Sequence, residues 1–305
     1  MRDGFVDTLT ELAGEDERVM LVTADLGFGI FNKYIEQFPS RFLNVGVAEQ
    51  NMIGISTGLA LDGWKIFAYS IGNFSTLRCL EQIRNDASYH GANVNVVCSG
   101  GGFTYGNLGM SHHATEDISI MRALPGLTVV APCDRFETRH AVRALAATPG
   151  VGYLRIEKQV PIDTSGLGIP YQLGKARRLR EGRDVTIIGC GGIVADVLAA
   201  ADQLLKRNIS ARVVSMHTLT PVDVEEIRDA AATTGAIVTV EENQVSGGLG
   251  GAVAEVCVEM GIGVKFRRLG LAGVYSAIVG DQQFLRNYYG VDASAICAAV
   301  RELTS

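Results

Sequence analysis

A single glutamate stands in the first turn of an otherwise apolar, glycine-rich segment, "GVAEQNMIGISTGLAL" (residues 46–61). An acid at this point of a helix can simply stabilise exposed backbone N–H groups through the helix dipole. That explanation accounts for the position of Glu49 but not for its apolar neighbours. A carboxyl in such surroundings is expected to be protonated or tightly hydrogen-bonded near neutral pH. Glu49 could therefore share a proton with a nitrogen of a flat heterocyclic ligand, for which the glycines leave room.

A second group of reactive side chains lies in "GGGFTYGNLGMSHHATED" (residues 100–117), after a predicted buried strand. Glycines let a backbone approach a ligand closely, so we expect an active-site loop in which an imidazole contacts substrate. A zinc site would need His112, His113 and a third ligand to converge, and adjacent histidines rarely point the same way. In the other alternative, the loop is structural, and Glu116 and Asp117 cap the next helix.

The surrounding pattern predicts the elements that position these groups. Short β-branched runs alternate with amphipathic helical patterns, which is typical of a parallel sheet covered on both faces. We predict an α/β fold with two doubly wound domains, each built on a mainly parallel sheet. The periodicity lapses in a proline- and glycine-containing stretch, so the boundaries are residues 1–158 for the first domain, 159–182 for a linker and 183–305 for the second domain.

Weaker motifs in the second half favour structural interpretations. The run "IIGCGGIV" ends a strand and opens a helix like a dinucleotide fingerprint, but Val194 stands at its third glycine position and no acid ends the next strand. A tight turn is the better interpretation. The "EEN" of residues 241–243 could bind a ligand at a strand end or form a solvated turn. Thr220 is expected to be a helix N-cap, and His217 beside it to be structural.

Composition excludes several classes of function. The chain has 305 residues, 47 % of them hydrophobic, and a net charge of −6 without a run of Lys or Arg, so we expect no nucleic-acid partner. The start lacks a leader-like apolar region, and no long uncharged apolar stretch follows, so we expect a cytoplasmic protein without membrane contact. The six cysteines are scattered singly, which predicts reduced core residues.

Three blocks in order carry a resemblance to a known family: "RFLNVGVAEQNMIGISTGLALDGWKIFAYSIGNFSTLRCLEQIRND", "GGGFTYGNLGMSHHATEDISIMRALPGLTVVAPCD" and "YLRIEK". Together they resemble the pyrimidine-binding domain of the transketolase family, including its deoxyxylulose-phosphate synthase branch. The second half resembles the C-terminal domain of that family. The resemblance covers essentially the whole chain and implies an enzyme of thiamine diphosphate.

Matched position by position, the resemblance implies roles for four residues. Glu49 would hydrogen-bond N1′ of the aminopyrimidine and promote the tautomer that removes the thiazolium C2 proton. Phe74, in "GNF", would stack on the pyrimidine ring, and Asp25, in "TADLG", would lie near the cofactor. His112 would contact the oxygens of the donor sugar.

The resemblance also implies phosphate contacts and shows departures. Arg155 in "YLRIEK" matches an arginine that binds substrate phosphate, and Arg78 matches another with a shift of one residue. Leu108 replaces a substrate-contacting aspartate, and Gly100 replaces a substrate histidine of full-length transketolases. The diphosphate-binding signature G-D-G with a later asparagine pair is absent, because Gln282 follows Gly280-Asp281.

These matches and departures predict half of an active site. We expect the β-type subunit of a split transketolase, a transferase that moves a two-carbon ketol unit from a ketose, in our expectation a phosphate ester, to an aldose. A separate diphosphate-binding subunit would complete an α2β2 assembly and hold most of the Mg²⁺ coordination, so we predict no metal site on this chain. The alternatives are a deoxyxylulose-phosphate-synthase-like enzyme, a β subunit of a 2-oxo acid dehydrogenase and a non-catalytic scaffold.

Overall fold

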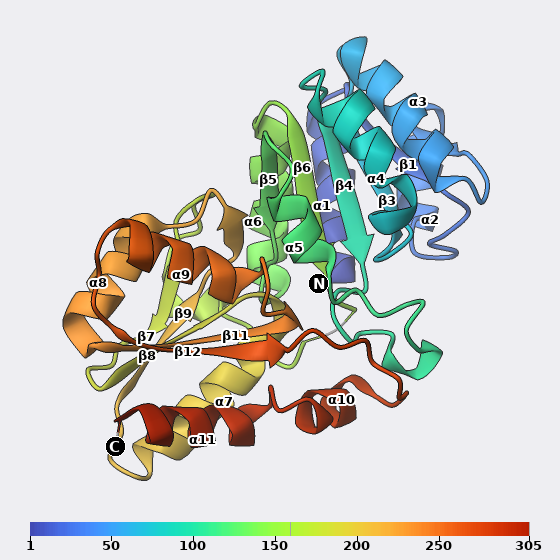
Figure 1. The fold of residues 1–305 in the computed structure, drawn as a ribbon. Coiled ribbons are helices and arrows are strands. Elements are labelled where there is room, and N and C mark those ends of the chain that lie inside the picture. Colours follow the sequence, from blue (N-terminus) through green and yellow to red (C-terminus); the bar gives the residue numbers. More distant parts are fainter. Residues whose placement is uncertain (159, 305) are drawn as a thin grey trace.

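The computed structural model describes residues 1–158 and 160–304, and it has two lobes that each enclose a β-sheet (Figure 1). The first lobe runs from blue to green in the chain colours and the second from yellow to red. The predicted class, α/β with two mainly parallel sheets, is confirmed.

The first sheet has seven strands in the order β10-β5-β6-β4-β3-β1-β2, and only β10 runs antiparallel to its neighbour. Its strands are β1 (Val19–Thr23), β2 (Phe42–Asn44), β3 (Lys65–Ile71), β4 (Val94–Ser99), β5 (Leu127–Val130), β6 (Val151–Ile156) and β10 (Thr218–Thr220). The helices and helical turns of this lobe are α1 (Arg2–Glu15), α2 (Asn32–Gln37), η1 (Pro39–Arg41), α3 (Glu49–Leu61), η2 (Leu77–Cys79), α4 (Leu80–Gln82), η3 (Ile83–Ser88), η4 (Gly106–Leu108), α5 (Asp117–Arg122) and α6 (Arg135–Ala147).

Helices cover both faces of this sheet because successive strand residues point to opposite sides. Leu21 and Phe67 pack in one apolar cluster with residues of α1, α2 and α6, whereas Val22 and Ala68 pack in another with residues of α3, η3 and α5. The strands therefore need the continuous apolar runs that their sequences carry.

The second sheet has five strands in the order β12-β11-β8-β9-β7, and only β7 is antiparallel. Its strands are β7 (Arg177–Arg180), β8 (Val185–Gly189), β9 (Ala211–Ser215), β11 (Ala236–Gln244) and β12 (Lys265–Leu271). The helices of this lobe are α7 (Val194–Leu205), α8 (Val224–Thr234), α9 (Leu249–Glu259), α10 (Gln282–Tyr288) and α11 (Ala293–Thr304), and η5 (Ser165–Leu167) and η6 (Gly191–Ile193) are short turns.

Two strands near the boundary of the lobes join sheets in a way that the sequence did not predict. Strand β7 lies within the predicted linker but joins the second sheet, and β10 lies within the predicted second domain but joins the first. Thr220 is consequently a strand residue and not the expected cap; Asp223 caps α8 and accepts a hydrogen bond from the backbone N–H of Glu226. One apolar cluster contains residues of both lobes, so they share a continuous core.

Two further expectations concern chemistry outside the site. All six cysteines are unpaired, and five of them are buried, as predicted. Within residues 1–158 and 160–304, no helix is both long and apolar enough to cross a bilayer.

Candidate active site

The first turn of α3 holds Glu49 at the carboxyl edge of the first sheet. A turn through Gly46, whose φ of +79° favours glycine, leads from β2 into the helix, which begins at Glu49. The glutamate is only 2 % exposed, and its Oε2 accepts a hydrogen bond of 2.8 Å from Nη1 of Arg78. Its Oε1 makes no hydrogen bond in the part of the chain that the structure describes. One carboxylate oxygen therefore remains for a ligand.

Arg78 and Phe74 lie next to this glutamate on the segment that follows β3. The guanidinium carbon of Arg78 lies 4.2 Å from the centre of the Phe74 ring. This contact is a cation–π interaction. The arginine side chain is 46 % exposed, whereas the glutamate beneath it is nearly inaccessible. A flat cation thus covers the ring and hydrogen-bonds to the carboxylate at the same time.

His112 borders the same ring from the loop that follows β4. Its imidazole lies 5.3 Å from the Phe74 ring, centre to centre, at an angle of 64°. Burial, with a smaller contribution from neighbouring His113, lowers the pKa of His112, so the ring is neutral at physiological pH. Its Nδ1 lies 3.0 Å from Oγ of Ser111. A neutral imidazole can accept a proton from a ligand hydroxyl.

Asn73 is a site residue that the sequence reasoning missed. Its Nδ2 donates a 2.7 Å hydrogen bond to the backbone carbonyl of His113 and approaches those of Ser111 and Met110. The residue before Phe74 therefore ties the ring-bearing segment to the histidine loop. The signal was present, because Asn73 belongs to the same "GNF" that identified Phe74.

Asp25 lies at the carboxyl end of β1 and has an unusual backbone conformation. Its φ is +55°, a left-handed value that is uncommon outside glycine and that clusters at functional sites. Asn44 holds this turn: its Oδ1 accepts from the backbone N–H of Asp25 at 2.9 Å and from that of Gly46 at 3.0 Å. Asn44, which the sequence analysis did not single out, thereby links Asp25 to the lead into α3.

Tyr105 occupies the space beside the glycine that departs from the family pattern. Gly100 has a φ of +94°, and a Cβ there would overlap the Tyr105 ring. A histidine at position 100 would strain the backbone and would require the Tyr105 ring to move. The Tyr105 ring also lies 6.4 Å from that of His112, and Leu108 nearby is exposed.

Arg155 lies inside the protein, at the end of β6. The resemblance predicts a phosphate contact; in the structure this side chain is 1 % exposed and ion-paired within the protein. Its Nε donates to Asp117 at 2.9 Å, and its Nη2 donates to the backbone carbonyls of Ala114 and Glu242. Asp117 is therefore the ion-pair partner of Arg155 as well as the first residue of α5. Arg155 thus connects the lobes through Nε and Nη2, and its contact with a phosphate stays a prediction.

The carboxyl edge of the second sheet is filled by the protein itself. Glu157, which follows β6, accepts a 2.6 Å hydrogen bond from the backbone N–H of Gly192, so a carboxylate occupies the turn that resembled a dinucleotide fingerprint. Glu241 accepts from the backbone N–H groups of Leu249 and Gly250 and so caps α9. Burial raises the pKa of Glu241 to about 7. The "EEN" run is buried, and neither the ligand-binding nor the solvated-turn interpretation describes it.

His113 and His217 are structural. His113 is 2 % exposed, and its Nε2 lies 3.1 Å from the carbonyl oxygen of Gly106. His217 is fully buried against the Tyr171 ring, and burial lowers its pKa to about 3. Across the described parts of the chain, no three His, Cys, Asp or Glu side chains converge as a metal site would require.

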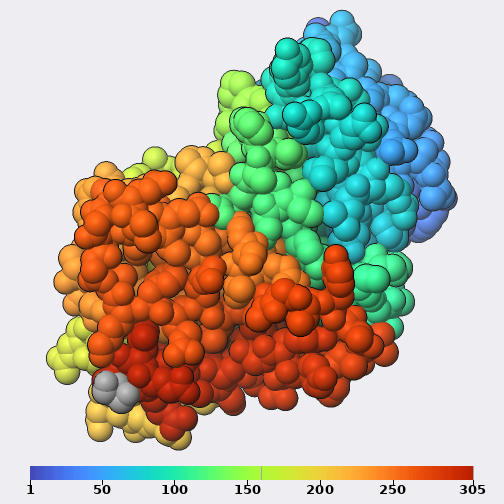
Figure 2. All heavy atoms as spheres, viewed as in Figure 1, coloured from blue at the N-terminus to red at the C-terminus, as the bar shows by residue number. Residues whose placement is uncertain are grey.

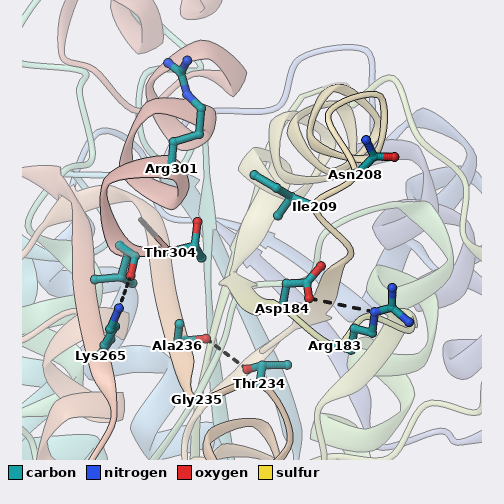
Figure 3. Close-up of a pocket in the computed structure, with 11 residues that line it drawn as sticks. Arg183, Asp184, Asn208, Ile209, Thr234, Gly235, Ala236, Lys265, Arg301 and Thr304 are labelled. Atoms are coloured by element: carbon teal, nitrogen blue, oxygen red, sulfur yellow. Dashed lines mark hydrogen bonds and ion pairs between the residues drawn. The ribbon is translucent and has the colours of Figure 1, made fainter.

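A large hollow lies away from these residues. It measures about 600 Å³ and opens at the amino ends of β8, β9, β11 and β12 (Figure 3). Two of its cations have partners, marked by dashed lines in the figure: Nζ of Lys265 donates to the carbonyl of Leu303, and Arg183 pairs with Asp184. Ligands of parallel α/β sheets bind at the opposite, carboxyl edge, so size alone does not identify the site.

Comparison with known protein families agrees with this geometry. The model of the transketolase pyrimidine-binding domain matches residues 1–161, and that of the transketolase C-terminal domain matches residues 174–296. The chain therefore belongs to the transketolase family.

Individual relatives include separate subunits. A putative transketolase C-terminal section of Methanocaldococcus jannaschii is 39 % identical, over 99 % of this chain and 95 % of the relative. One of the subunits of an apulose-4-phosphate transketolase of Phocaeicola vulgatus is 38 % identical, over 99 % of this chain and 96 % of the relative. A 1-deoxy-D-xylulose-5-phosphate synthase of Geobacter sulfurreducens is 36 % identical, over 97 % of this chain but 46 % of its own.

A solved structure described as a split gene transketolase, an inactive beta4 tetramer, superposes with a TM-score of 0.92. It is 36 % identical and matches over 99 % of this chain and 97 % of its own. These similarities support a transferase-type enzyme subunit.

Proposed function

We propose that this chain is the β-type subunit of a split, thiamine-diphosphate-dependent transketolase that transfers a two-carbon ketol unit from a ketose to an aldose. The observation that carries the proposal is the group formed by Glu49, Phe74 and His112 at one sheet edge, in a chain of this family. Each of the three matches a position with a role in cofactor or substrate binding.

The residues present fit the pyrimidine half of the cofactor. Arg78 serves as a stand-in: a flat, positively charged group with N–H donors already lies on the Phe74 ring and hydrogen-bonds to Glu49. An aminopyrimidine whose ring nitrogen is protonated is likewise flat, positively charged and able to donate N–H hydrogen bonds. The site therefore suits such a ring, which would replace Arg78 there.

In the reaction, thiamine diphosphate when bound supplies the electron sink for breaking and forming a carbon–carbon bond. Glu49 holds a proton on N1′ of the pyrimidine, and Phe74 orients the ring by stacking. His112, which is neutral, accepts or returns the proton of a sugar hydroxyl. Asp25 lies at the end of β1, where the side chain of Asn44 holds its turn beside the lead into α3.

A partner subunit would complete the site. The chain lacks the G-D-G signature, so the diphosphate and its Mg²⁺ need carboxylate and amide ligands from another chain. Large apolar side chains are exposed around the site, including Phe28 at 78 % and Val47 at 74 %. Such side chains favour burial against a protein surface. We place them against a diphosphate-binding subunit in an α2β2 assembly.

Native mass analysis of the complex tests this proposal. The chain would be isolated through a tag, with thiamine diphosphate and Mg²⁺ present, and assayed with hydroxypyruvate as ketol donor and a panel of aldoses. We expect a companion chain that carries G-D-G and one cofactor per chain pair. The product should be a ketose that is two carbons longer than the aldose supplied. A homodimer that binds no cofactor, from cells that make no such companion, would contradict the proposal.

The synthase alternative is favoured by one observation, the similarity to a 1-deoxy-D-xylulose-5-phosphate synthase. The same complex distinguishes the two reactions. Consumption of pyruvate with release of CO₂, and formation of a product with a terminal methyl group, would identify the synthase. Transfer of a hydroxyacetyl-derived unit without use of pyruvate would identify the transketolase.

A further inference from the structure

The loop that carries His112 has its anchor in the second lobe. We call residues 100–116 the histidine loop. Phe103 of this loop is fully buried in a small apolar cluster with Leu271 and Leu285, against which Ile278 and Tyr289 pack. Every other member of this cluster belongs to the second lobe. The rings of Phe103 and Tyr289 are stacked, 5.4 Å apart and 15° from parallel.

The middle of the histidine loop is also held by the second lobe. The carbonyl of Gly106 accepts a 3.4 Å hydrogen bond from the backbone N–H of Gly280, and a Cβ on Gly106 would overlap the Gly280 carbonyl. Figure 1 shows the segment between β12 and α10 running along the loop, and in Figure 2 the surfaces of the two segments meet at the lower right. The two segments are therefore in direct backbone contact.

His113 connects the anchored part of the loop to His112. Its ring meets the edge of Phe103 at 5.3 Å, and its Nε2 lies 3.1 Å from the Gly106 carbonyl oxygen. His112 is the adjacent residue, so its backbone position follows from that of His113. In contrast, the ring contacts of His112 itself are to Phe74 and Tyr105 of the first lobe.

Buried charges fix the two ends of the loop. Near its start, Oε1 of Glu242 lies 3.4 Å from the backbone nitrogen of Phe103, which donates to it. Near its end, Arg155 donates to the carbonyl of Ala114 and, through the same nitrogen, to the carbonyl of Glu242. Arg286 of α10 holds the Glu242 carboxylate at 2.7 Å. A continuous network from the second lobe thus reaches both ends.

We propose that Phe103 and Tyr289 are positioning residues: through their contact, the second lobe holds the histidine loop so that His112 lies beside the Phe74 ring. This inference rests on the proposed function for the role of His112, whereas the anchoring itself is a property of the chain. Among the residues that the structure describes, the side-chain hydrogen bonds and ring contacts of Glu49, Phe74 and His112 are all to the first lobe. The second lobe acts on the reaction by fixing the loop.

The test uses the full chain in its complex, with the variants Phe103→Ala and Tyr289→Ala. Amide hydrogen exchange is followed in peptides covering residues 104–113, and turnover is followed with hydroxypyruvate. We expect exchange in the loop to be about tenfold faster in both variants, because a local opening that costs less becomes more frequent. We expect the KM for hydroxypyruvate to rise by about tenfold, with the Kd for thiamine diphosphate within about twofold, since Glu49 and Phe74 are untouched.

Tyr275→Ala is the matched control, because it removes a ring of the same size that is 73 % exposed on the segment between β12 and α10. It should leave loop exchange and KM unchanged. If Phe103→Ala fails to fold, Tyr289→Ala, at a partly buried position, carries the test. Unchanged loop exchange in the folded variants, or equal acceleration throughout the chain, would overturn the inference. Absence of turnover by the wild-type complex would instead contradict the proposed function and leave the exchange result to stand.

Discussion

The carboxyl edges of the two sheets differ in what covers them. At the first, Glu49 stands in a helical first turn with one carboxylate oxygen free of hydrogen bonds in the described structure, beneath a half-exposed arginine. At the second, Glu241 stands at a comparable place and both its oxygens accept backbone N–H groups of α9. Both glutamates are buried. Glu49 can still hydrogen-bond to a ligand, whereas both oxygens of Glu241 are used in hydrogen bonds within the protein.

The difference shows that a doubly wound sheet provides a place for a site but does not make one. The helix turn after β8 has its backbone N–H of Gly192 occupied by Glu157 from the first lobe. A carboxylate thus fills the position at which such sheets bind phosphates. The carboxyl edge of the second sheet therefore binds the other lobe, whereas that of the first sheet carries the candidate active-site residues.

Glu49→Gln should have the largest effect. Loss of the group that holds a proton on the pyrimidine removes general acid–base assistance, so we expect turnover to fall by about 10³-fold or more. The free energy of unfolding should change little, because Arg78, the partner of Glu49, is half-exposed and can be solvated. Steady-state assay of the complex and native mass analysis check both statements; a fully active variant would contradict the role of Glu49.

His112→Asn should rank next, with kcat/KM lowered by about 10²-fold. In the wild type, activity should decline on acidification with an apparent pKa below the ordinary histidine value, because burial lowers the pKa of His112 and only the neutral ring accepts a proton. The variant should lose this acid limb. A pH profile of kcat/KM decides the matter, and an acid limb that persists unchanged in the variant would assign it to another group.

Glu241→Gln should reverse the pattern of Glu49→Gln. Each oxygen of Glu241 accepts one backbone N–H group of α9, and the glutamine amide has only one oxygen, so one N–H group loses its acceptor. We therefore expect a loss of about 1–3 kcal/mol in the free energy of unfolding. Turnover per folded molecule should be preserved. Denaturant titration beside the activity assay measures both quantities. If the variant instead lost turnover without losing stability, Glu241 would have a catalytic role, which would contradict the difference between the two edges.

Glu241 also predicts a pH dependence of stability. Its pKa is raised to about 7 in the folded chain, so between its ordinary value near 4.5 and about 7 the folded state binds the proton more tightly than the unfolded state. Its contribution to stability therefore falls as the pH rises through that window. The difference between the wild type and Glu241→Gln, measured by thermal unfolding from pH 5 to 8, should change with this sign.

Arg78→Ala should have the smallest effect. Arg78 competes with a flat ligand for the Phe74 ring through a half-exposed cation–π contact worth about 1 kcal/mol, so its removal should tighten thiamine diphosphate binding by roughly fivefold. Arg84→Ala, an exposed arginine of the same segment, is the control. Titration calorimetry of the complex provides the Kd. Weaker binding would mean that Arg78 contacts the cofactor or a phosphate instead.

Local pattern was sufficient for much of the fold and the first edge. The apolar runs, the helix of Glu49, and the grouping of Phe74 with His112 all follow from sequence spacing and resemblance. These features depend on neighbours that are close along the chain. Asn73 lay within the same quoted motif and could have been found there.

Contacts between distant segments were not predictable in this way. Arg155 resembles a phosphate ligand until Asp117 and Glu242 surround it. The glycine turn at Gly192 looks open until Glu157 arrives from the other lobe. Strand β10 is short and joins a sheet whose other strands lie far earlier in the chain. The contacts of Arg155 with Glu242 and of Gly192 with Glu157, and the place of β10, depend on how the two lobes pack, which no local pattern encodes.

An electron cryo-microscopy structure of the complex with thiamine diphosphate and Mg²⁺ tests the central claim most directly. The account predicts a pyrimidine ring stacked on Phe74, with its N1′ at hydrogen-bond distance from Glu49 and with Arg78 displaced from the ring. A cofactor bound elsewhere, with Arg78 still paired to Glu49 over Phe74, would contradict it.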